Sequence, residues 1–415
     1  MMKSLSRIMP LLLVCCTHTS AQEQSETPLQ IVMRVADKVV LETSFKVELV
    51  QQGEGKNSTL KAVIPANASF RDHSYFEWHY SNGQMALAII QLADATKNEH
   101  YAQFIDRYCS TTLNLYDSCK YRYEVLNEKK VFNYRLFLKG MLDNTSAAAL
   151  PFSESAVHGE SKATRFLVDE MANFIRHDQT RLDDGTLCRP DPQERTVWAD
   201  DLFMSVPFLL RYGKLSGDQS CFDDAAFQII NFHKYLFEKK TGLSYHCWFD
   251  AAKKHGVAHW GRANGWMVWA TTEALLHLPT SHRYYDEVVS IFRQQVKGFV
   301  KYQDENGMWH QVIDHAESYE ETSCTAMFVL ALARGIRNGW IEKEYEGNMM
   351  RGWNALKNHI ADDGTVAGIC QGTGIGETLD FYFQRKTLPH DPRGLGAVIT
   401  AGVEVQLMMQ QSKQE

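Results

Sequence analysis

The amino-acid sequence predicts an all-α fold, an (α/α)6 barrel in which six helical hairpins form one closed ring. Three observations support this fold class: a long repeat, two kinds of helix, and recurring glycine turns. Polar or small clusters lead into segments rich in Ala, Leu, Met and Phe about every 60 residues, a period typical of a repeated supersecondary unit. These segments start near Ser81, Asp143, Asp200, Gly261, Glu321 and Arg393.

Each repeat also contains a more polar, amphipathic helix. In residues 161–177, the apolar side chains recur three and four positions apart, as expected for a helix that is wet on one side. The helices that open each repeat are apolar on nearly every side. This contrast predicts an inner ring of helices that an outer ring buries.

Glycine turns follow most of the outer helices, at Gly185, Gly242, Gly307 and Gly364, where a left-handed residue ends a helix. The amphipathic segment 29–41 is expected to pack outside the last inner helix, which closes the ring at six and six. Residues 41–78 read as an irregular excursion with short strands at 45–50 and 60–64. An open solenoid is the alternative, but its repeats are shorter, at about 34 to 47 residues.

The first 21 residues resemble a secretory signal peptide. Lys3 and Arg7 precede the apolar run 8–16, and small residues precede Gln22. We therefore expect a signal peptide at 1–21, a single barrel domain at 22–415, and a periplasmic or secreted protein. A lipid anchor at Cys15 or Cys16 is the alternative, and no later stretch is long enough to span a membrane.

Charge and cysteine content exclude other classes of partner. The formal net charge is −7 and the sequence has no Lys/Arg run, which argues against nucleic-acid binding. The cysteines beyond the leader show no CxxC spacing, so a zinc cluster and a disulfide framework are not expected. A bond between Cys109 and Cys119 stays an alternative, and the oligomeric state stays open.

In a closed ring, the N-terminal ends of all inner helices open on one face. That face would collect aromatic rings, paired carboxylates and a few cations, which are the groups that a sugar-binding pocket needs. The positive ends of the helix dipoles also favour an anionic ligand there.

Several motifs follow one another in the predicted repeats. They are LDN at 142–144, WADDLFM at 198–204, GLSYH at 242–246, WGRANGW at 260–266, ETSCTAM at 321–327 and QGTG at 371–374. This series resembles that of the unsaturated rhamnogalacturonyl hydrolases, glycoside hydrolase family 105, and the resemblance covers most of the chain from about Trp78 to Val405. The series is also similar to the related unsaturated glucuronyl hydrolases of family 88.

The resemblance implies removal of the terminal 4,5-unsaturated uronic acid from lyase-generated oligosaccharides, by hydration of the C4=C5 enol ether and without a metal or organic cofactor. It implies that Asp200 is the acid and base and that Asp143 is its partner. A carboxyl in that role needs a pKa raised by burial or by a nearby carboxylate. The implied substrate-binding residues are His246, Arg262 and Trp266 for the uronate ring, with Trp260, Trp78 and Tyr80 around the pocket.

Each of these residues has a structural alternative. Asp200, Asp201 and Asp143 could cap helices, Arg262 could pair with a helix end, and the tryptophans could belong to the core. Glu320 and Glu321 could form a second acid pair, but we expect them to cap a helix or to support the site. Residues 184–190 depart from the family's usual pattern; we expect them to shape the pocket without affecting the proposed acid.

Two other functions remain open at this point. A polysaccharide lyase on the same toroid would need a Tyr or His base, for which Tyr80, Tyr245 and His246 are available. A lyase creates ultraviolet absorbance from a saturated polymer, whereas the hydrolase destroys it. A non-catalytic glycan-binding ring would be unaffected by Asp200→Asn.

Overall fold

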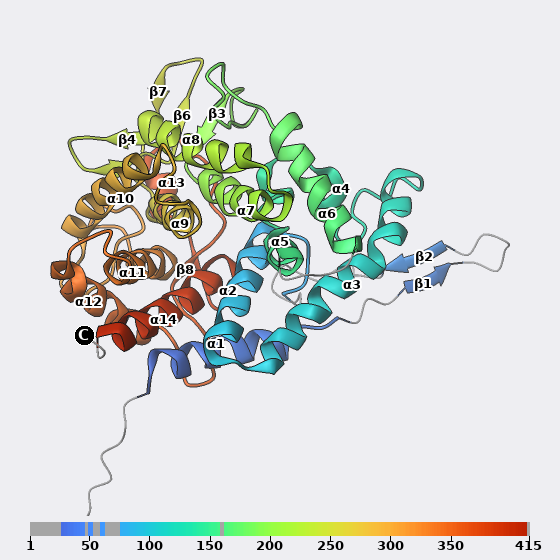
Figure 1. The fold of residues 1–415 in the computed structure, drawn as a ribbon, viewed down its shortest axis with the longest axis horizontal. Coiled ribbons are helices and arrows are strands. Elements are labelled where there is room, and N and C mark those ends of the chain that lie inside the picture. Colours follow the sequence, from blue (N-terminus) through green and yellow to red (C-terminus); the bar gives the residue numbers. More distant parts are fainter. Residues whose placement is uncertain (1–25, 46–48, 53–58, 63–74, 158–161, 413–415) are drawn as a thin grey trace, which may run out of the picture.

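Inner and outer helices alternate along the chain and around a ring (Figure 1). The computed structural model describes residues 26–45, 49–52, 59–62, 75–157 and 162–412. The inner helices are α2 (Tyr80–Thr96), α5 (Leu150–Val157), α7 (Asp201–Ser216), α9 (Gly261–His277), α11 (Thr322–Arg337) and α14 (Pro392–Ser412). The outer helices are α1 (Pro28–Glu42), α3 (Glu99–Glu124), α6 (Lys162–Asn173), α8 (Gln219–Leu236), α10 (Tyr285–Phe299) and α12 (Glu346–Lys357). The predicted (α/α)6 barrel is confirmed.

Helix α14 closes the ring, because it packs against both α11 and α2, and α1 lies against its outer side. The burial of the two rings follows the predicted contrast. In α9 every residue from Gly261 to Leu275 is buried, whereas α10 buries a stripe that includes Val288, Ile291, Phe292 and Val296. The outer helices therefore shield the inner ring from water.

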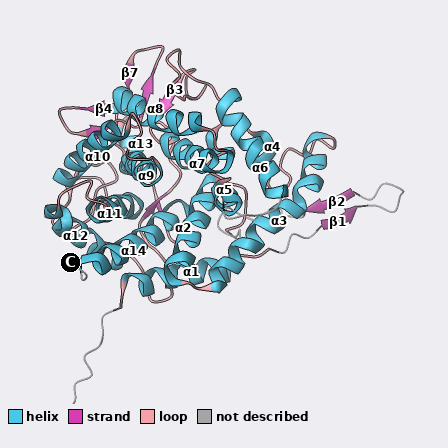
Figure 2. Cartoon of the chain, viewed as in Figure 1, coloured by secondary structure: helices cyan, strands magenta, loops and turns pink. Residues whose placement is uncertain are grey.

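Short elements connect the helices (Figure 2). Two short helices are α4 (Arg135–Leu138) and α13 (Leu379–Phe383). The strands are β1 (Leu49–Gln52), β2 (Thr59–Ala62), β3 (Thr196–Trp198), β4 (Phe237–Glu238), β5 (Leu243–Ser244), β6 (Cys247–Phe249), β7 (Lys254–His255), β8 (Ile369–Cys370) and β9 (Thr387–Leu388). They pair antiparallel as β1-β2, β3-β6-β7, β4-β5 and β8-β9. The predicted strands between α1 and α2 are present as β1 and β2.

The four predicted glycine turns adopt the left-handed backbone. The φ angles are +91° at Gly185, +82° at Gly242, +93° at Gly307 and +83° at Gly364. Side chains other than hydrogen are strained at such angles, so glycine is required where each outer helix returns toward the ring.

The second inner helix is shorter than the repeat predicts. Asp143 lies on a separate 3-10 turn, Leu142–Asn144, and α5 begins only at Leu150. Pro151 stands in the first turn of α5, where its missing N–H costs no helical hydrogen bond. Asp143 therefore sits on a turn that lies before the inner helix, and not on the helix itself.

A chain of alternating charges joins five inner helices. Arg211 of α7 pairs with Glu154 of α5 and, at 2.9 Å, with Glu273 of α9. Glu273 also accepts from Arg334 of α11 at 2.7 Å, and Arg334 donates to Glu404 of α14 at 2.7 Å. These residues lie toward the C-terminal ends of their helices, far along the ring axis from the helix N-termini.

The seven cysteines of the described chain are all free and buried, so the alternative disulfide between Cys109 and Cys119 is wrong. Both stand on α3, where ten residues of helix separate them by about 15 Å, well beyond disulfide reach. The predicted signal peptide, with Cys15 and Cys16, lies outside the described residues.

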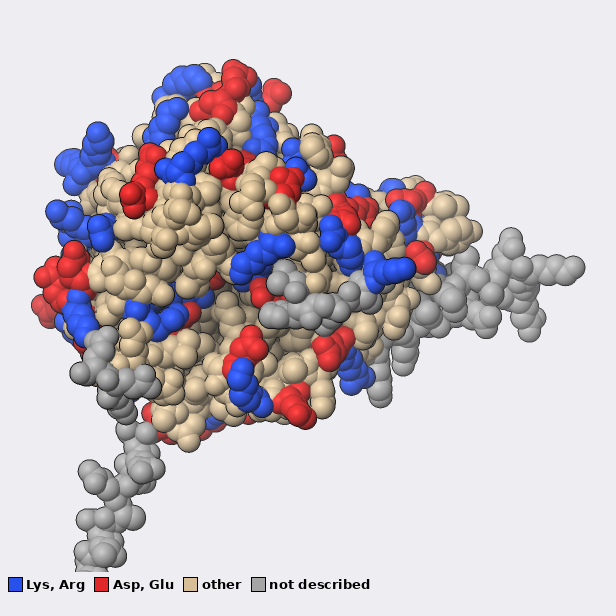
Figure 3. All heavy atoms as spheres, in the orientation of Figure 1, with Lys and Arg blue, Asp and Glu red and all other residues tan. Residues whose placement is uncertain are grey.

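Among the described helices, none combines the length and the apolar character that a membrane crossing needs. The same part of the chain contains no group of three His, Cys, Asp or Glu side chains placed to hold a metal ion. Acidic and basic residues are interspersed on the face shown in Figure 3.

Replacing Glu273 by Gln should destabilise the fold by about 3–5 kcal/mol, because two buried arginines would lose their common carboxylate. Urea denaturation followed by circular dichroism measures this change. Glu317→Gln, which alters an exposed pair with His315, is the control and should leave the midpoint unchanged. Equal midpoints for the two variants would show that the buried chain of charges does not stabilise the ring.

Candidate active site

A pocket of about 320 Å³ opens at the N-terminal ends of inner helices α2, α7 and α9. Its lining residues, drawn from distant parts of the sequence, are Tyr80, Asp143, Arg189, Trp198, Asp200, Met204, Trp260, Arg262 and Thr373. Carboxylates, arginines and aromatic rings thus share one small concavity, a combination suited to a charged sugar. Five of the predicted site residues are among them.

Two adjacent carboxylates start α7 and have different surroundings. Asp200 occupies the N-cap position but has helical angles (φ −56°, ψ −36°), and its side chain makes no capping hydrogen bond. A capping side chain requires an extended backbone, so the capping alternative for Asp200 is wrong. Asp201 is fully buried and accepts from Arg189 Nε at 3.0 and 2.8 Å, which makes it a structural partner.

His246 lies next to the carboxylate of Asp200. Its Nε2 is 3.2 Å from Asp200 Oδ2, and its Nδ1 is 2.8 Å from the hydroxyl of Tyr382. The N–H of Ala199 donates to the carbonyl of His246 at 3.0 Å, which fixes the two chain segments side by side. Asp200 Oδ2 makes no aligned hydrogen bond with the described residues, so it is close to His246 without being tied to it.

The positive charges around Asp200 decide its protonation state. Burial favours the neutral carboxyl, but His246, Arg189 and Arg262 outweigh burial and hold the pKa of Asp200 below its ordinary value. The predicted increase in the pKa of Asp200 is therefore wrong for the protein alone, because the fold gathers cations that are distant in sequence. Burial instead raises the pKa of the neighbouring Asp201 to about 6, even beside Arg189.

Arg189 connects the carboxylates of the site. Its Nη2 lies 2.8 Å from Asp143 Oδ1, the same guanidinium holds Asp201, and its Cζ lies 4.6 Å from the centre of the Trp198 ring. Residues 184–190 thus shape the pocket, as predicted. The expectation that they do not affect the proposed acid is wrong, because Arg189 helps to lower the pKa of Asp200.

Arg262 lies beneath the glycine loop that follows β8. It donates to the carbonyls of Cys370 at 2.5 Å and Gln371 at 2.8 Å, and its Cζ is 4.7 Å from the centre of the Trp260 ring. Within the described part of the chain, carbonyl groups and no carboxylate hold its guanidinium, so the helix-end salt bridge considered for it is wrong. Its charge faces a pocket that Trp260 and Tyr80 also line, as predicted.

Trp266, predicted to bind the uronate, belongs to the core. It is 1% exposed and stacks on Trp269, with ring centres 5.7 Å apart. The centre of its ring lies 4.7 Å from that of Phe203. Because α9 is buried on all sides, a position more than one turn from its start faces other helices and not the pocket.

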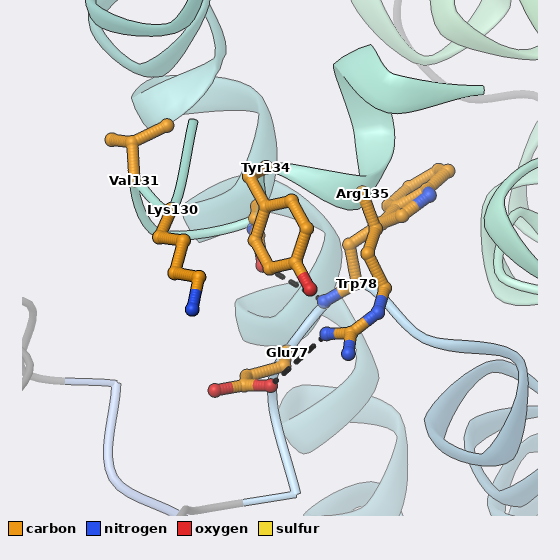
Figure 4. Close-up of a pocket in the computed structure, with 7 residues that line it drawn as sticks. Glu77, Trp78, Lys130, Val131, Tyr134 and Arg135 are labelled. Carbon is orange, nitrogen blue, oxygen red and sulfur yellow. Dashed lines mark hydrogen bonds and ion pairs between the residues drawn. The ribbon is translucent and has the colours of Figure 1, made fainter. Parts of the chain in front are cut away.

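Trp78 also lies outside the pocket that it was predicted to wall. It lines a neighbouring cavity (Figure 4) with Glu77, Lys130, Val131, Asn133, Tyr134 and Arg135. Its indole N–H donates to the carbonyl of Asn144 at 2.7 Å, and its backbone N–H donates to Asn133 Oδ1 at 2.8 Å. Trp78 therefore supports the turn that carries Asp143.

The motif-based prediction missed several residues at or beside the pocket: Arg189, Trp198, Met204, Thr373 and Tyr382. Three of them stand within quoted motifs, and Met204 follows Asp200 by one helical turn, which places both on one face. No signal in the sequence points to Tyr382.

The predicted cap of α11 is confirmed. Glu321 accepts from the backbone N–H groups of Ser323 at 3.0 Å and Cys324 at 2.7 Å. It also accepts from the N–H of Cys370 at 2.8 Å, which anchors β8 above the ring. This carboxylate is therefore occupied by structural hydrogen bonds.

Comparisons with known proteins agree with this architecture. An unsaturated rhamnogalacturonyl hydrolase, YesR of Bacillus subtilis, is 26% identical over 316 residues, which are 74% of this chain and 84% of the relative. An unsaturated 3S-rhamnoglycuronyl hydrolase of Alteromonas sp. is 27% identical over 219 residues, 51% of this chain and 52% of the relative.

Solved structures share the fold. A possible member of family 105 from Klebsiella pneumoniae superposes with a TM-score of 0.73 at 19% identity, covering 97% of this chain and 99% of that one. The family 105 hydrolase of C. acetobutylicum has a TM-score of 0.71 at 23% identity, covering 81% and 96%. The model of Glycosyl Hydrolase Family 88 matches residues 61–409, which include the whole pocket. The resemblance to these related families is confirmed, and the chain belongs to Glycosyl Hydrolase Family 88.

Proposed function

We propose that this glycoside hydrolase removes the terminal 4,5-unsaturated uronic acid from oligosaccharides that a polysaccharide lyase has produced. Asp200 is the acid and base of the reaction, and Asp143 is its partner. One observation carries these assignments: of the three neighbouring carboxylates, Asp143 and Asp201 are held by Arg189, whereas Asp200 lines the same pocket and is held by no arginine of the described chain.

The reaction is a hydration followed by ring opening. The C4=C5 double bond makes the sugar ring an enol ether, which a proton donor activates at C4. Asp200 gives its proton to C4, water adds through its oxygen to C5, and Asp200 takes up the proton that the water loses. The hemiketal formed at C5 opens to a ketone, which leaves C1 as a hemiacetal. Collapse of this hemiacetal to an aldehyde breaks the bond from C1 to the remaining oligosaccharide, which leaves as an alcohol.

The cations of the pocket fit an anionic substrate. Arg189 and Arg262 provide positive charge near Asp200, and the uronate brings a carboxylate to it. That added negative charge offsets the cations and favours the protonated form of Asp200 once the substrate is bound. The carboxylate of Asp143, which pairs with Arg189 at 2.8 Å, stabilises the positive charge that develops at C5.

The lyase alternative fits this pocket less well. Tyr245 donates its hydroxyl to Glu238 at 2.9 Å and stacks on His255, away from the pocket lining. Tyr80 lines the pocket, but burial raises its pKa, which opposes the tyrosinate that a lyase base requires.

We infer that the sugar next to the uronate is a rhamnose, as in fragments of rhamnogalacturonan or ulvan type. Both relatives named above carry rhamnose in the description of their substrates. A panel of lyase digests, each with a defined neighbouring sugar, separates these backbones by their relative rates.

Asp200→Asn should lower kcat/KM by about 10²–10⁴-fold, because an amide neither donates nor accepts the transferred proton. The measurement is the loss of ultraviolet absorbance from an unsaturated uronyl–rhamnose disaccharide. Asp224→Asn is the matched control, since its side chain is 21% exposed against 15% for Asp200, and it pairs with Arg181 outside the pocket. Full activity of Asp200→Asn would exclude Asp200 as the acid.

The pH dependence should differ between the free enzyme and its complex. The pKa of Asp200 is lowered in the free protein, so kcat/KM should decline as pH rises through a range where kcat is still constant. The direction of this pH dependence follows because Asp200 must be protonated to act as the acid. The negative charge of the bound uronate favours the protonated carboxyl in the complex. Identical alkaline limbs for kcat and kcat/KM would contradict this account.

Export is proposed from residues 1–21 alone. Mass spectrometry of the mature protein should find Gln22 at its N-terminus, in the periplasm or the medium. A cytosolic protein that still begins with Met1 would contradict export. A mature protein that begins with a lipid-modified Cys15 or Cys16 would instead show a lipid anchor.

A further inference from the structure

One guanidinium, that of Arg189, holds two of the three carboxylates of the site, Asp143 and Asp201, and its charge acts on the third, Asp200. We propose that Arg189 is a positioning residue for the reaction: it orients Asp143 relative to Asp200 and balances the charge under which Asp200 exchanges its proton. This inference rests on the proposed function and assigns a role that the family motifs did not suggest.

The geometry places Arg189 between the two proposed catalytic groups. Arg189 Nε lies 2.8 and 3.0 Å from the oxygens of Asp201, and its Nη2 contacts both Asp201 and, at 2.8 Å, Asp143. Asp201 follows Asp200 at the start of α7. The planar guanidinium therefore fixes where Asp143 lies relative to α7, and so relative to Asp200.

Arg189 is itself held on several sides. Its backbone pairs with Thr196 through hydrogen bonds of 2.8 and 2.9 Å, and its guanidinium lies over the ring of Trp198. Only 4% of the residue is exposed, so water screens its charge little. A group that is both immobile and poorly screened can set a geometry and a local charge together.

The charge balance predicts the direction of each effect. Arg189 favours the ionised form of Asp200, so removing it should keep the proton on Asp200 to a higher pH. A lysine would restore the charge but not the fork that holds two carboxylates at once. It should therefore restore the pH profile more fully than the rate.

Arg181 offers a matched control on the same segment. It stands on the other side of the Gly185 turn and holds Asp224 with two hydrogen bonds of 3.0 and 2.7 Å. That pair resembles the pair of Arg189 with Asp201, but it lies away from the pocket. Arg181→Gln therefore removes a similar ion pair without touching the catalytic carboxylates.

The experiment measures kcat/KM against pH for wild type, Arg189→Gln, Arg189→Lys and Arg181→Gln, each corrected for its folded fraction. Arg189→Gln should lose about 100-fold in kcat/KM and shift the alkaline limb to higher pH. Arg189→Lys should return the limb toward its wild-type position and recover part of the rate. Arg181→Gln should keep both the rate and the limb.

The proposal would be overturned if the alkaline limb of kcat/KM did not move in Arg189→Gln. It would also be overturned if Arg189→Gln and Arg181→Gln lost kcat/KM equally. If Arg189→Gln does not fold, Asp201→Asn serves instead. It removes a negative charge near Asp200 and should move the alkaline limb to lower pH, whereas no movement would contradict the proposal. A wild-type enzyme that leaves every unsaturated substrate intact would refute the proposed function, a result distinct from an unchanged limb.

Discussion

The inner helices of this ring are buried on every side, and this burial constrains every charge that they contain. A charge without a partner would be unstable there, so each one needs ion pairs or hydrogen bonds from its neighbours. Glu273, for example, lies between Arg211 and Arg334, and the alternation of sign continues from α5 to α14. Inner helices that are neighbours in the ring therefore contribute side chains of opposite charge.

The same constraint builds the catalytic face at the opposite end of the helices. Three carboxylates gather near the start of α7, and Arg189 pairs with two of them. The third, Asp200, is left next to His246 at 3.2 Å, in a pocket that Arg262 also lines. The pairing of Asp143 and Asp201 with Arg189 thus leaves Asp200, the proposed acid, as the carboxylate of this group that no arginine among the described residues holds.

In the proposed mechanism, the positive charges near Asp200 connect substrate recognition with proton transfer. In the protein alone, these cations keep Asp200 ionised, which suits a group that must recover a proton from water. A bound uronate supplies the opposite charge and favours the acid form. The pocket is small and lies at the mouth of the ring, a shape that accepts the end of a chain more readily than its middle.

The sequence by itself determined the ring, because hydrophobic periodicity and glycine turns are local properties that can be recognised in one amino-acid sequence. It also pointed to Asp200, Asp143 and Tyr80, which stand at or near the starts of inner helices. Only the tertiary structure decided which way Trp266 faces. Its helix is buried on all sides, so the pattern of apolar residues does not show which side of the helix faces the pocket. Likewise, the pKa of Asp200 and the role of Arg189 depend on charges that are distant in sequence, whose distances and burial exist only in the folded ring.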